Sequence, residues 1–253
     1  MQLNQYQHEF KTAALERDEA GVLTVTLHSK GGPLWWSGLP HRELAELFHA
    51  VAADRDNRVV IITGTGDTFI ALPDGGAKTL AAGGVSPAGW DEIIHEGRRL
   101  VEGMLSVGVP MIAAVNGPVV VHSELAVLCD IVLCTPATHF ADVAHFPSGL
   151  MPGDGMQVIW PLLLGPNRGR YFLLTGQHLG AQEALACGVV GEVIESAALM
   201  PRAAQLAGDL AVRHPLLLRN TRAALVRPLQ RAMAEDLHLG LALEALTSVA
   251  QRP

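Results

Sequence analysis

The chain has 253 residues, 49% of them hydrophobic, and a formal net charge of -7 at pH 7. This composition excludes a disordered protein and fits one large domain, or a domain with a helical extension, around a sizeable core. Because its 18 Lys and Arg residues form no basic block, neither nucleic acid nor an anionic membrane is an expected partner.

No apolar run follows the charged start at residues 1–11, and the apolar stretch at 111–121 is broken by an Asn-Gly-Pro sequence. Neither a signal peptide nor a membrane helix is therefore predicted, and a cytoplasmic protein is expected. The three cysteines lack a CxxC or Cys/His ligand spacing and are predicted to be buried thiols: Cys129, Cys134 and Cys187.

Strands and helices are predicted to alternate through the first half of the chain. Alternating apolar and β-branched residues predict a strand at 22–27, helical spacing predicts a helix at 41–54, and a continuous apolar run predicts a strand at 59–63. The pattern then repeats, with a helix at about 90–107, a strand at 111–115, a short helix at 123–128 and a strand at 131–134. This order predicts an α/β fold with a largely parallel sheet or a spiral of ββα turns.

Helix is predicted to dominate after Gly155, with one further apolar stretch at 189–194. Three amphipathic helices are expected at the C-terminal end, separated by breaks at Arg213-His214-Pro215 and at Arg227-Pro228: 199–213, 215–226 and 231–249. We therefore expect a core at 1–195 and a helical region at 196–253 that assembles subunits or caps a site.

Three blocks, at 61–74, 113–131 and 173–190, occur in an order that resembles the crotonase (enoyl-CoA hydratase/isomerase) superfamily. The second contains Asn116-Gly117, followed by Glu124-Leu125. The resemblance covers roughly residues 15–250. It implies a crotonase-like spiral of ββα turns with a C-terminal helical trimerisation region, and a homotrimer or a dimer of trimers.

The sequence departs from this family at the groups that hold a thioester enolate. Crotonases typically use two backbone N–H groups, one in each of the first two loops. Pro73 lies near the expected first donor and has no N–H, while Val119-Val120-Val121-His122 replaces the second loop's glycines. Because negative charge on a carbonyl oxygen still needs a donor, we predict that the His122 imidazole supplies it.

A second histidine falls where hydratases commonly carry a catalytic glutamate. This is His145, and Asp154 lies just beyond the turn at Pro152-Gly153. A histidine with a pKa near 6.5 is a better base for water at neutral pH than a carboxylate. An aspartate bonded to its other ring nitrogen would fix the tautomer, so His145 and Asp154 are predicted as a catalytic pair.

Together these residues resemble the β-diketone hydrolases of the 6-oxocamphor hydrolase type, which act without CoA. The resemblance rests on a set of aromatic and titratable residues: Trp36, His122, His145, Asp154, Trp160 and Glu244. It implies Trp36 and Glu244 as pocket residues. An apolar wall is expected from Leu34, Leu72, Phe146 and Trp160, around a neutral diketone that is cleaved by a retro-Claisen reaction, with no metal, nucleotide or CoA.

Other interpretations of single residues stay open. His122 could be a satisfied core histidine, Asp154 could cap the helix that starts near Gly155, Glu124 could be a buried helix-start residue, and Trp35 and Trp36 could fill the core. Two histidines and an aspartate also form a legitimate metal ligand set, although the family pattern favours acid/base chemistry. The glycine pairs within 74–84 have neither the lysine and serine of a phosphate loop nor a GxGxxG spacing, so a phosphate loop is not expected. Four histidines without motif support are expected to be structural: His139, His178, His214 and His238.

Two rival functions remain. One is a CoA-thioester hydratase, isomerase or decarboxylase, which the fold alone favours. The other is a non-catalytic trimeric module that has kept the fold.

Overall fold

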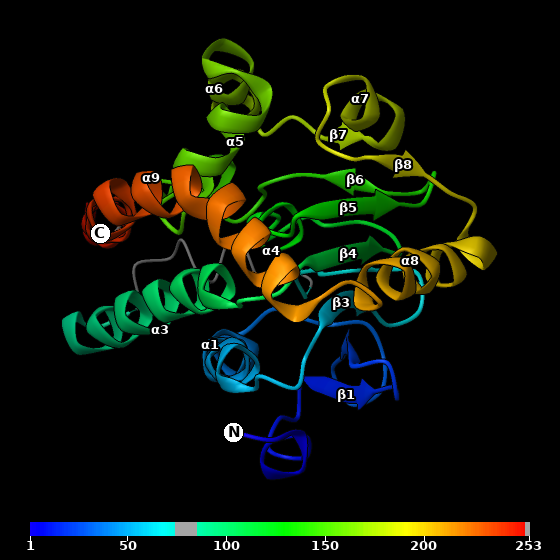
Figure 1. Cartoon of the computed structure of the whole chain (residues 1–253). Coiled ribbons are helices and arrows are strands. Elements are labelled where there is room, and N and C mark those ends of the chain that lie inside the picture. The colour runs from blue at the N-terminus through cyan, green and yellow to red at the C-terminus, as the bar shows by residue number, and fades with distance from the viewer. Residues whose placement is uncertain (74–84, 251–253) are drawn as a thin grey trace.

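The computed structural model describes residues 1–73 and 85–250, and its centre is a six-stranded sheet (Figure 1). The strands lie in the order β1 (Ala13–Arg17), β2 (Val22–Leu27), β3 (Val59–Gly64), β4 (Met111–Val115), β5 (Ile131–Cys134) and β8 (Glu192–Val193). β1 is antiparallel to β2, and every later pairing is parallel. A separate antiparallel pair is formed by β6 (His139–Phe140) and β7 (Leu179–Gly180).

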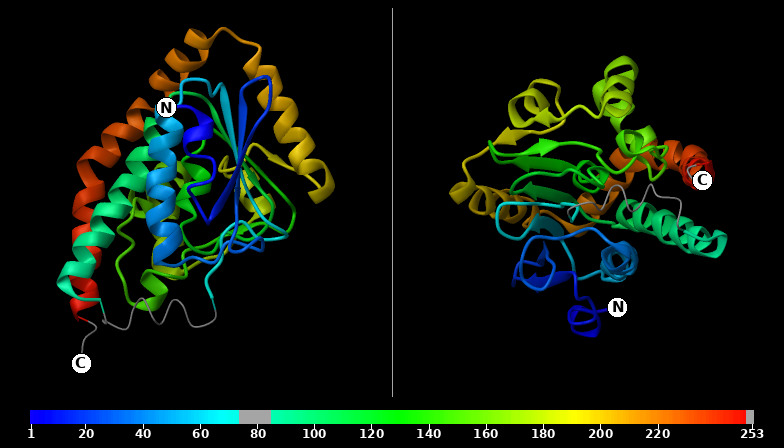
Figure 2. Two further views of the ribbon diagram at one scale, coloured as in Figure 1. Left: turned by 90° about the horizontal axis from the view of Figure 1, so that it is seen from below. Right: turned by 180° about the vertical axis from the view of Figure 1, so that it is seen from behind.

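Helices cover both faces of this sheet, which explains the nearly unbroken apolar sequence of its central strands (Figure 2). On one face, Val59 and Ile61 of β3 pack against the alanines of α8 (Ser196–Ala211). On the other face, Val60 and Ile62 join the main core with α1 (Gly38–Ala53) and α3 (Pro87–Ser106). The α/β class with a largely parallel sheet is thereby confirmed.

The remaining helices of residues 1–73 and 85–250 are short, apart from the last. They are η1 (Leu3–Gln5), α4 (Glu124–Val127), η2 (Phe146–Ser148), α5 (Met156–Leu164), α6 (Pro166–Thr175), α7 (Ala181–Ala186) and α9 (Pro215–Ala250). Across the part of the chain that the structure describes, every helix is too short or too polar to span a bilayer.

The prediction of two separate helices at 215–226 and 231–249 is wrong, because α9 continues through Pro228. A proline inside a helix costs about 3 kcal/mol through a lost hydrogen bond and a steric clash. Here Val226, Met233, Leu237 and Leu241 form one buried stripe along α9, which packs beside α3 and α5, so that tertiary packing outweighs this cost.

Smaller differences occur near β8 and the cysteines. The apolar stretch at 189–194 gives only the two-residue strand β8, because Val189 and Val190 donate their backbone N–H groups to Ala184 in a buried turn. Cys129 and Cys134 are buried thiols as predicted, whereas Cys187 is partly exposed.

Loops that follow the strands are tied to one another, and this arrangement positions the site. Isolated bridges join Trp35 to Ala71, Ile70 to Val119 and Val119 to Phe140. Four segments that are far apart in the sequence are thereby stacked in register. Each leads directly to a side chain that faces the main cavity.

Candidate active site

A cavity of about 400 Å³ lies between α1, α3, α9 and the loops beyond β4 and β6. Its volume falls in the range of small-molecule sites. Its wall is largely apolar with a few titratable groups, and it includes Trp36, His41, Leu72, Pro73, Trp90, Glu96, His122, His145, Leu150, Asp154, Leu241 and Glu244.

His122 lies in this wall with a strained backbone. Its φ of 46° lies in the left-handed region, which costs a non-glycine residue about 1–3 kcal/mol and is often found at functional sites. Its ring lies 3.8 Å from that of Trp36, and its Nδ1 lies 2.7 Å from Glu124 Oε1. Burial, with the charges of His41 and His145, lowers the pKa of His122 to about 3 although Asp154 opposes the shift, so that the imidazole is neutral at physiological pH.

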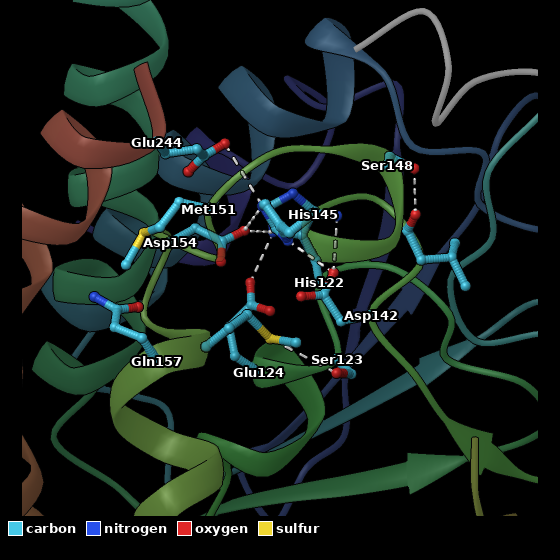
Figure 3. Close-up of polar contacts among 12 residues, drawn as sticks. His122, Ser123, Glu124, Asp142, His145, Ser148, Met151, Asp154, Gln157 and Glu244 are labelled. Carbon is cyan, nitrogen blue, oxygen red and sulfur yellow. Dashed lines mark hydrogen bonds and ion pairs between the residues drawn. The ribbon is translucent and has the colours of Figure 1, made fainter. Parts of the chain in front are cut away.

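His145 is held from both sides of its ring (Figure 3). Its Nδ1 lies 2.7 Å from Asp142 Oδ1, which also accepts the backbone N–H of His145. Its Nε2 lies 3.5 Å from Asp154 Oδ2 and 3.5 Å from Glu244 Oε1. Burial lowers the pKa of His145, but Asp142, Asp154 and Glu244 outweigh it and hold that pKa well above its usual value.

The expectation that Asp154 orients His145 through its other ring nitrogen is wrong in one respect. Asp142 occupies that position, because a residue three places earlier in the same turn brings its carboxylate to Nδ1. Asp154 lies between the two histidines instead, with Oδ2 at 3.0 Å from His122 Nδ1 and at 3.5 Å from His145 Nε2. It does not cap α5 either, whose N-cap is Gly155 without a side-chain cap.

Glu244 reaches the site from α9, about 100 residues away in sequence from His145. Gly153 permits this approach, because a Cβ there would lie 2.3 Å from the carbonyl oxygen of Gly240, one turn before Glu244. Burial is the largest influence and raises the pKa of Glu244, while the neighbouring His145 opposes it. His145, His122, Asp154 and Glu244 are therefore brought together as expected.

The predicted apolar wall is only partly correct. Trp36 and Leu72 line the cavity. Trp160 does not, because it is fully buried against Phe172 and Phe140. Leu34 and Phe146 are absent from the wall as well. Leu34 is buried in the core, while Phe146 is 48% exposed and contributes to a separate hollow with Leu174 and Thr247.

Their places are taken by apolar side chains that the sequence did not single out, namely Trp90, Leu150 and Leu241. These come from α3, the loop after η2 and α9. Helical periodicity predicts that Trp90 and Leu241 face inward, but not that they face a cavity.

Polar groups at the site were also missed. His41 on α1 places its Nδ1 2.8 Å from Glu96 Oε2 of α3, and Glu96 Oε1 accepts from Arg42. The hydrogen bond to His41 is the main cause that lowers the pKa of Glu96. No sequence motif connects His41 of α1 with Glu96 of α3, so their contact could not be predicted. The i, i+3 spacing of Asp142 and His145, in contrast, was a usable signal that these two side chains meet.

Glu124 is the first residue of α4 and is fully buried, which agrees with its interpretation as a buried helix-start residue. Its side chain also contacts His122. Among the other histidines, His139 and His178 stack on each other at 5.0 Å, and neither lines the main cavity. Asp74 and the glycine pairs within 74–84 lie outside the described residues.

His122, Glu124 and Asp154 offer possible metal ligand atoms that all lie within 4.8 Å of one another. Two atoms that bind one tetrahedral zinc at about 2.0–2.1 Å are separated by about 3.3 Å. His122 Nδ1 and Glu124 Oε1 are 2.7 Å apart, which is a direct hydrogen bond. His122 and Glu124 in this arrangement therefore bind each other, and acid/base chemistry suits the three side chains better than metal coordination.

Solved structures show the same fold. A beta-diketone hydrolase from the cyanobacterium Anabaena sp. PCC 7120, bound to (S)-3-oxocyclohexyl acetic acid, is 40% identical, with a TM-score of 0.93 over 98% of each chain. An enoyl-CoA hydratase/isomerase from Mycobacterium paratuberculosis is 28% identical, with a TM-score of 0.86 over 94% of each chain.

Sequence comparison adds relatives that act on CoA esters. A carnitinyl-CoA dehydratase of Shigella flexneri is 32% identical over 184 residues, which are 70% of this chain and 66% of that protein. The chain thus spans just under two thirds of the length of these relatives. The Enoyl-CoA hydratase/isomerase family matches residues 19–251. The chain therefore belongs to the enoyl-CoA hydratase/isomerase family, and so to the crotonase superfamily.

Proposed function

We propose that this protein is a β-diketone hydrolase that cleaves the carbon–carbon bond of a cyclic or bicyclic β-diketone to a keto acid, without CoA or metal. One observation carries the proposal. His145, held by Asp142, and a neutral His122 lie with ring centroids 6.3 Å apart beside one largely apolar cavity. The full-length similarity to the Anabaena hydrolase supports the same reaction.

The proposed reaction begins with neutral His145, which removes a proton from water through Nε2 while the water oxygen attacks one carbonyl carbon. Asp142 at Nδ1 stabilises the imidazolium that forms. The tetrahedral adduct then breaks the bond to the carbon between the two carbonyls. The electron pair of that bond is delocalised onto the second carbonyl oxygen as an enolate.

His122 stabilises this enolate by donating a hydrogen bond from its side chain. The imidazolium of His145 returns the proton to the enolate carbon, and the product is a keto acid. Trp36 packs on the His122 ring and, with Leu72 and Trp90, excludes water from the apolar part of the substrate. A cavity of about 400 Å³ fits a compact bicyclic diketone.

The test is a panel of mono- and bicyclic β-diketones incubated with the purified protein, with the keto acid detected by mass spectrometry. Reaction in H₂¹⁸O should place one labelled oxygen in the new carboxylate, because water is the nucleophile. A panel that remains intact, together with turnover of crotonyl-CoA or carnitinyl-CoA, would overturn the proposal.

The second candidate is hydration or dehydration of a CoA thioester, which the carnitinyl-CoA dehydratase relatives favour. Against it, Pro73 offers no N–H, and a histidine replaces a glycine of the second loop at His122. A non-catalytic module is disfavoured for a different reason. Burying several carboxyl and imidazole groups in one place costs folding free energy that a merely structural core would avoid.

A further inference from the structure

Two carboxyl groups converge on one nitrogen of His122. Glu124 Oε1 lies 2.7 Å from Nδ1 in a hydrogen bond. Asp154 Oδ2 lies 3.0 Å from the same atom but forms no hydrogen bond there. Of the two carboxyl groups, only Glu124 therefore forms a hydrogen bond with His122 Nδ1 (Figure 3).

These two carboxyl groups cannot both be ionised cheaply. Their oxygens lie within 4.8 Å of each other, and the side chains are 0% exposed for Glu124 and 6% for Asp154. Like charges at this distance in a buried site favour protonation of one partner. Asp154 also lies 3.5 Å from His145 Nε2, whereas Glu124 forms no salt bridge with a Lys or Arg of the described residues. Burial, followed by the charge of Asp154, raises the pKa of Glu124 well above its usual range.

Hydrogen-bond satisfaction then decides where the proton lies. Glu124 Oε2 is buried without a hydrogen-bond partner in the described chain, so a hydrogen on it would be left without an acceptor. A hydrogen on Oε1 points at Nδ1 of His122 at 2.7 Å. A neutral imidazole that accepts at Nδ1 must carry its hydrogen on Nε2.

We propose that Glu124 is an un-ionised positioning residue, which donates its carboxylic hydrogen to His122 Nδ1 and so fixes the His122 tautomer that presents Nε2–H to the cavity. This inference deepens the proposed function. The tautomer of His122 does not depend on that function, but the effect of the tautomer on catalysis does. A neutral His122 with hydrogen on Nδ1 would be able only to accept at Nε2 and would repel the enolate oxygen. Glu124 makes it a hydrogen-bond donor without giving it a charge.

The direct test needs no substrate. In protein labelled with ¹⁵N-histidine, two-bond ¹H–¹⁵N correlations distinguish the two neutral tautomers and the imidazolium, and the His122 signals are assigned by their loss in H122Q. We expect the Nε2–H tautomer in the wild type, unchanged through neutral pH. The Nδ1–H tautomer or a charged His122 ring would overturn the proposal.

Two substitutions test the consequence. E124Q keeps an N–H that can be donated to Nδ1, so the Nε2–H tautomer and most of the turnover should be retained. E124M has a similar shape but no donor, and Asp154 can then capture a hydrogen on Nδ1. In E124M we expect the Nδ1–H tautomer and a fall in kcat of about 10²- to 10³-fold, the size typical of a lost oxyanion donor, with a smaller change in KM.

Circular dichroism and thermal unfolding establish whether each variant is folded. A folded E124M with the wild-type tautomer and kcat would overturn the proposal, and the wild-type spectrum decides the matter if E124M does not fold. Failure of the proposed function can be distinguished from failure of the proposed role of Glu124. In that case no diketone is cleaved, while the tautomer and its dependence on residue 124 are still observed.

Discussion

The surroundings of the two histidines at the site shift their pKa values in opposite directions. Burial, with the charges of His41 and His145, lowers the pKa of His122 to about 3. His145 is equally enclosed, yet three carboxyl groups, those of Asp142, Asp154 and Glu244, hold its pKa well above the usual value. Titratable groups with pKa values pushed apart in one cavity are the pattern expected of separate donor and base roles.

The first prediction concerns the base. His145→Ala should lower turnover of a β-diketone by roughly 10²- to 10⁴-fold with the fold intact, because general-base assistance is typically of that size. His139→Ala is the matched control, since His139 is partly exposed and outside the cavity wall. Wild-type turnover in His145→Ala would show that another group removes the proton.

The second prediction is the pH dependence. The active base is neutral His145, and its pKa is raised, so the rate should rise with pH through a limb that lies above about 6.5, the value of an unperturbed histidine. This limb belongs to the coupled group of His145 and its carboxyl neighbours. The profile of kcat/KM measures it, and a limb at or below the unperturbed value would contradict the assignment.

Asp142→Asn should move the same limb to lower pH, because one charge that raises the pKa of His145 is removed. The plateau rate should also fall, because the tautomer is no longer fixed by a carboxylate. The substitution Asp67→Asn, at an exposed position outside the cavity wall, is the control and should leave the limb in place.

The loops beyond β3 and β4 are locked together at the start of the segment that leads to His122. Asn116 accepts the backbone N–H of Gly64 through Oδ1 and donates through Nδ2 to the carbonyl oxygens of Gly66 and Thr68. Gly117 lies against the carbonyl oxygen of Asp67, where a Cβ would approach to 1.7 Å. The Asn-Gly pair is thus required by close backbone packing.

Gly117→Ala tests this locking. The added methyl group must displace the loop, and we expect a loss of about 1–3 kcal/mol in the free energy of unfolding, the usual cost of overpacking, together with reduced turnover through His122. Urea denaturation and initial rates measure the two effects. Gly208→Ala in α8 is the control, since its Cβ meets nothing within 4 Å and alanine favours helix by about 0.5–1 kcal/mol. Equal stability of the two variants would show that the loops are not locked at Gly117.

Across the whole molecule, the cavity is closed by parts of the chain that lie far apart in sequence. α1, α3 and α9 form one side, and the loops beyond β4 and β6 form the other. The largely apolar wall and the absence of a donating N–H at Pro73 suit a free diketone better than a thioester.

Cofactor independence is the corresponding prediction. Diketone cleavage should survive exhaustive dialysis against a chelator, and crotonyl-CoA should not be turned over. A missing enolate donor costs on the order of 3 kcal/mol, which disfavours CoA chemistry. Robust hydration of crotonyl-CoA, or loss of diketone cleavage that added metal restores, would argue for a different reaction.

Assembly as a homotrimer or a dimer of trimers also remains a prediction. Exposed leucines recur along α9, where they would be covered in such an assembly: Leu225, Leu239, Leu243 and Leu246. Light scattering coupled to size-exclusion chromatography measures the mass directly. A monomer at micromolar concentration would contradict the expectation.

Local patterns along the chain were enough to predict the α/β class and the central strands, whereas the resemblance to the crotonase superfamily predicted His122, His145, Asp154, Glu244 and Trp36 as residues of one site. Hydrophobic periodicity is a local signal, and the family blocks carry the positions of the site residues with them. The pairing of Glu124 with His122 and of Glu96 with His41 emerges only in the folded chain, whereas the i, i+3 spacing of Asp142 and His145 is a local signal for their pairing.

The positions of Trp160 and Phe146 are also decided only in the folded chain. Both are aromatic residues of a kind that lines pockets, but Trp160 lies in the core and Phe146 at the surface. The same is true at Pro228, where packing along one stripe of α9 overrides a local helix-breaking signal. In each case the outcome depends on which side chains from distant segments share a space. Hydrogen-bond partners, burial and pKa values are properties of that shared space, and no local pattern in the chain encodes them.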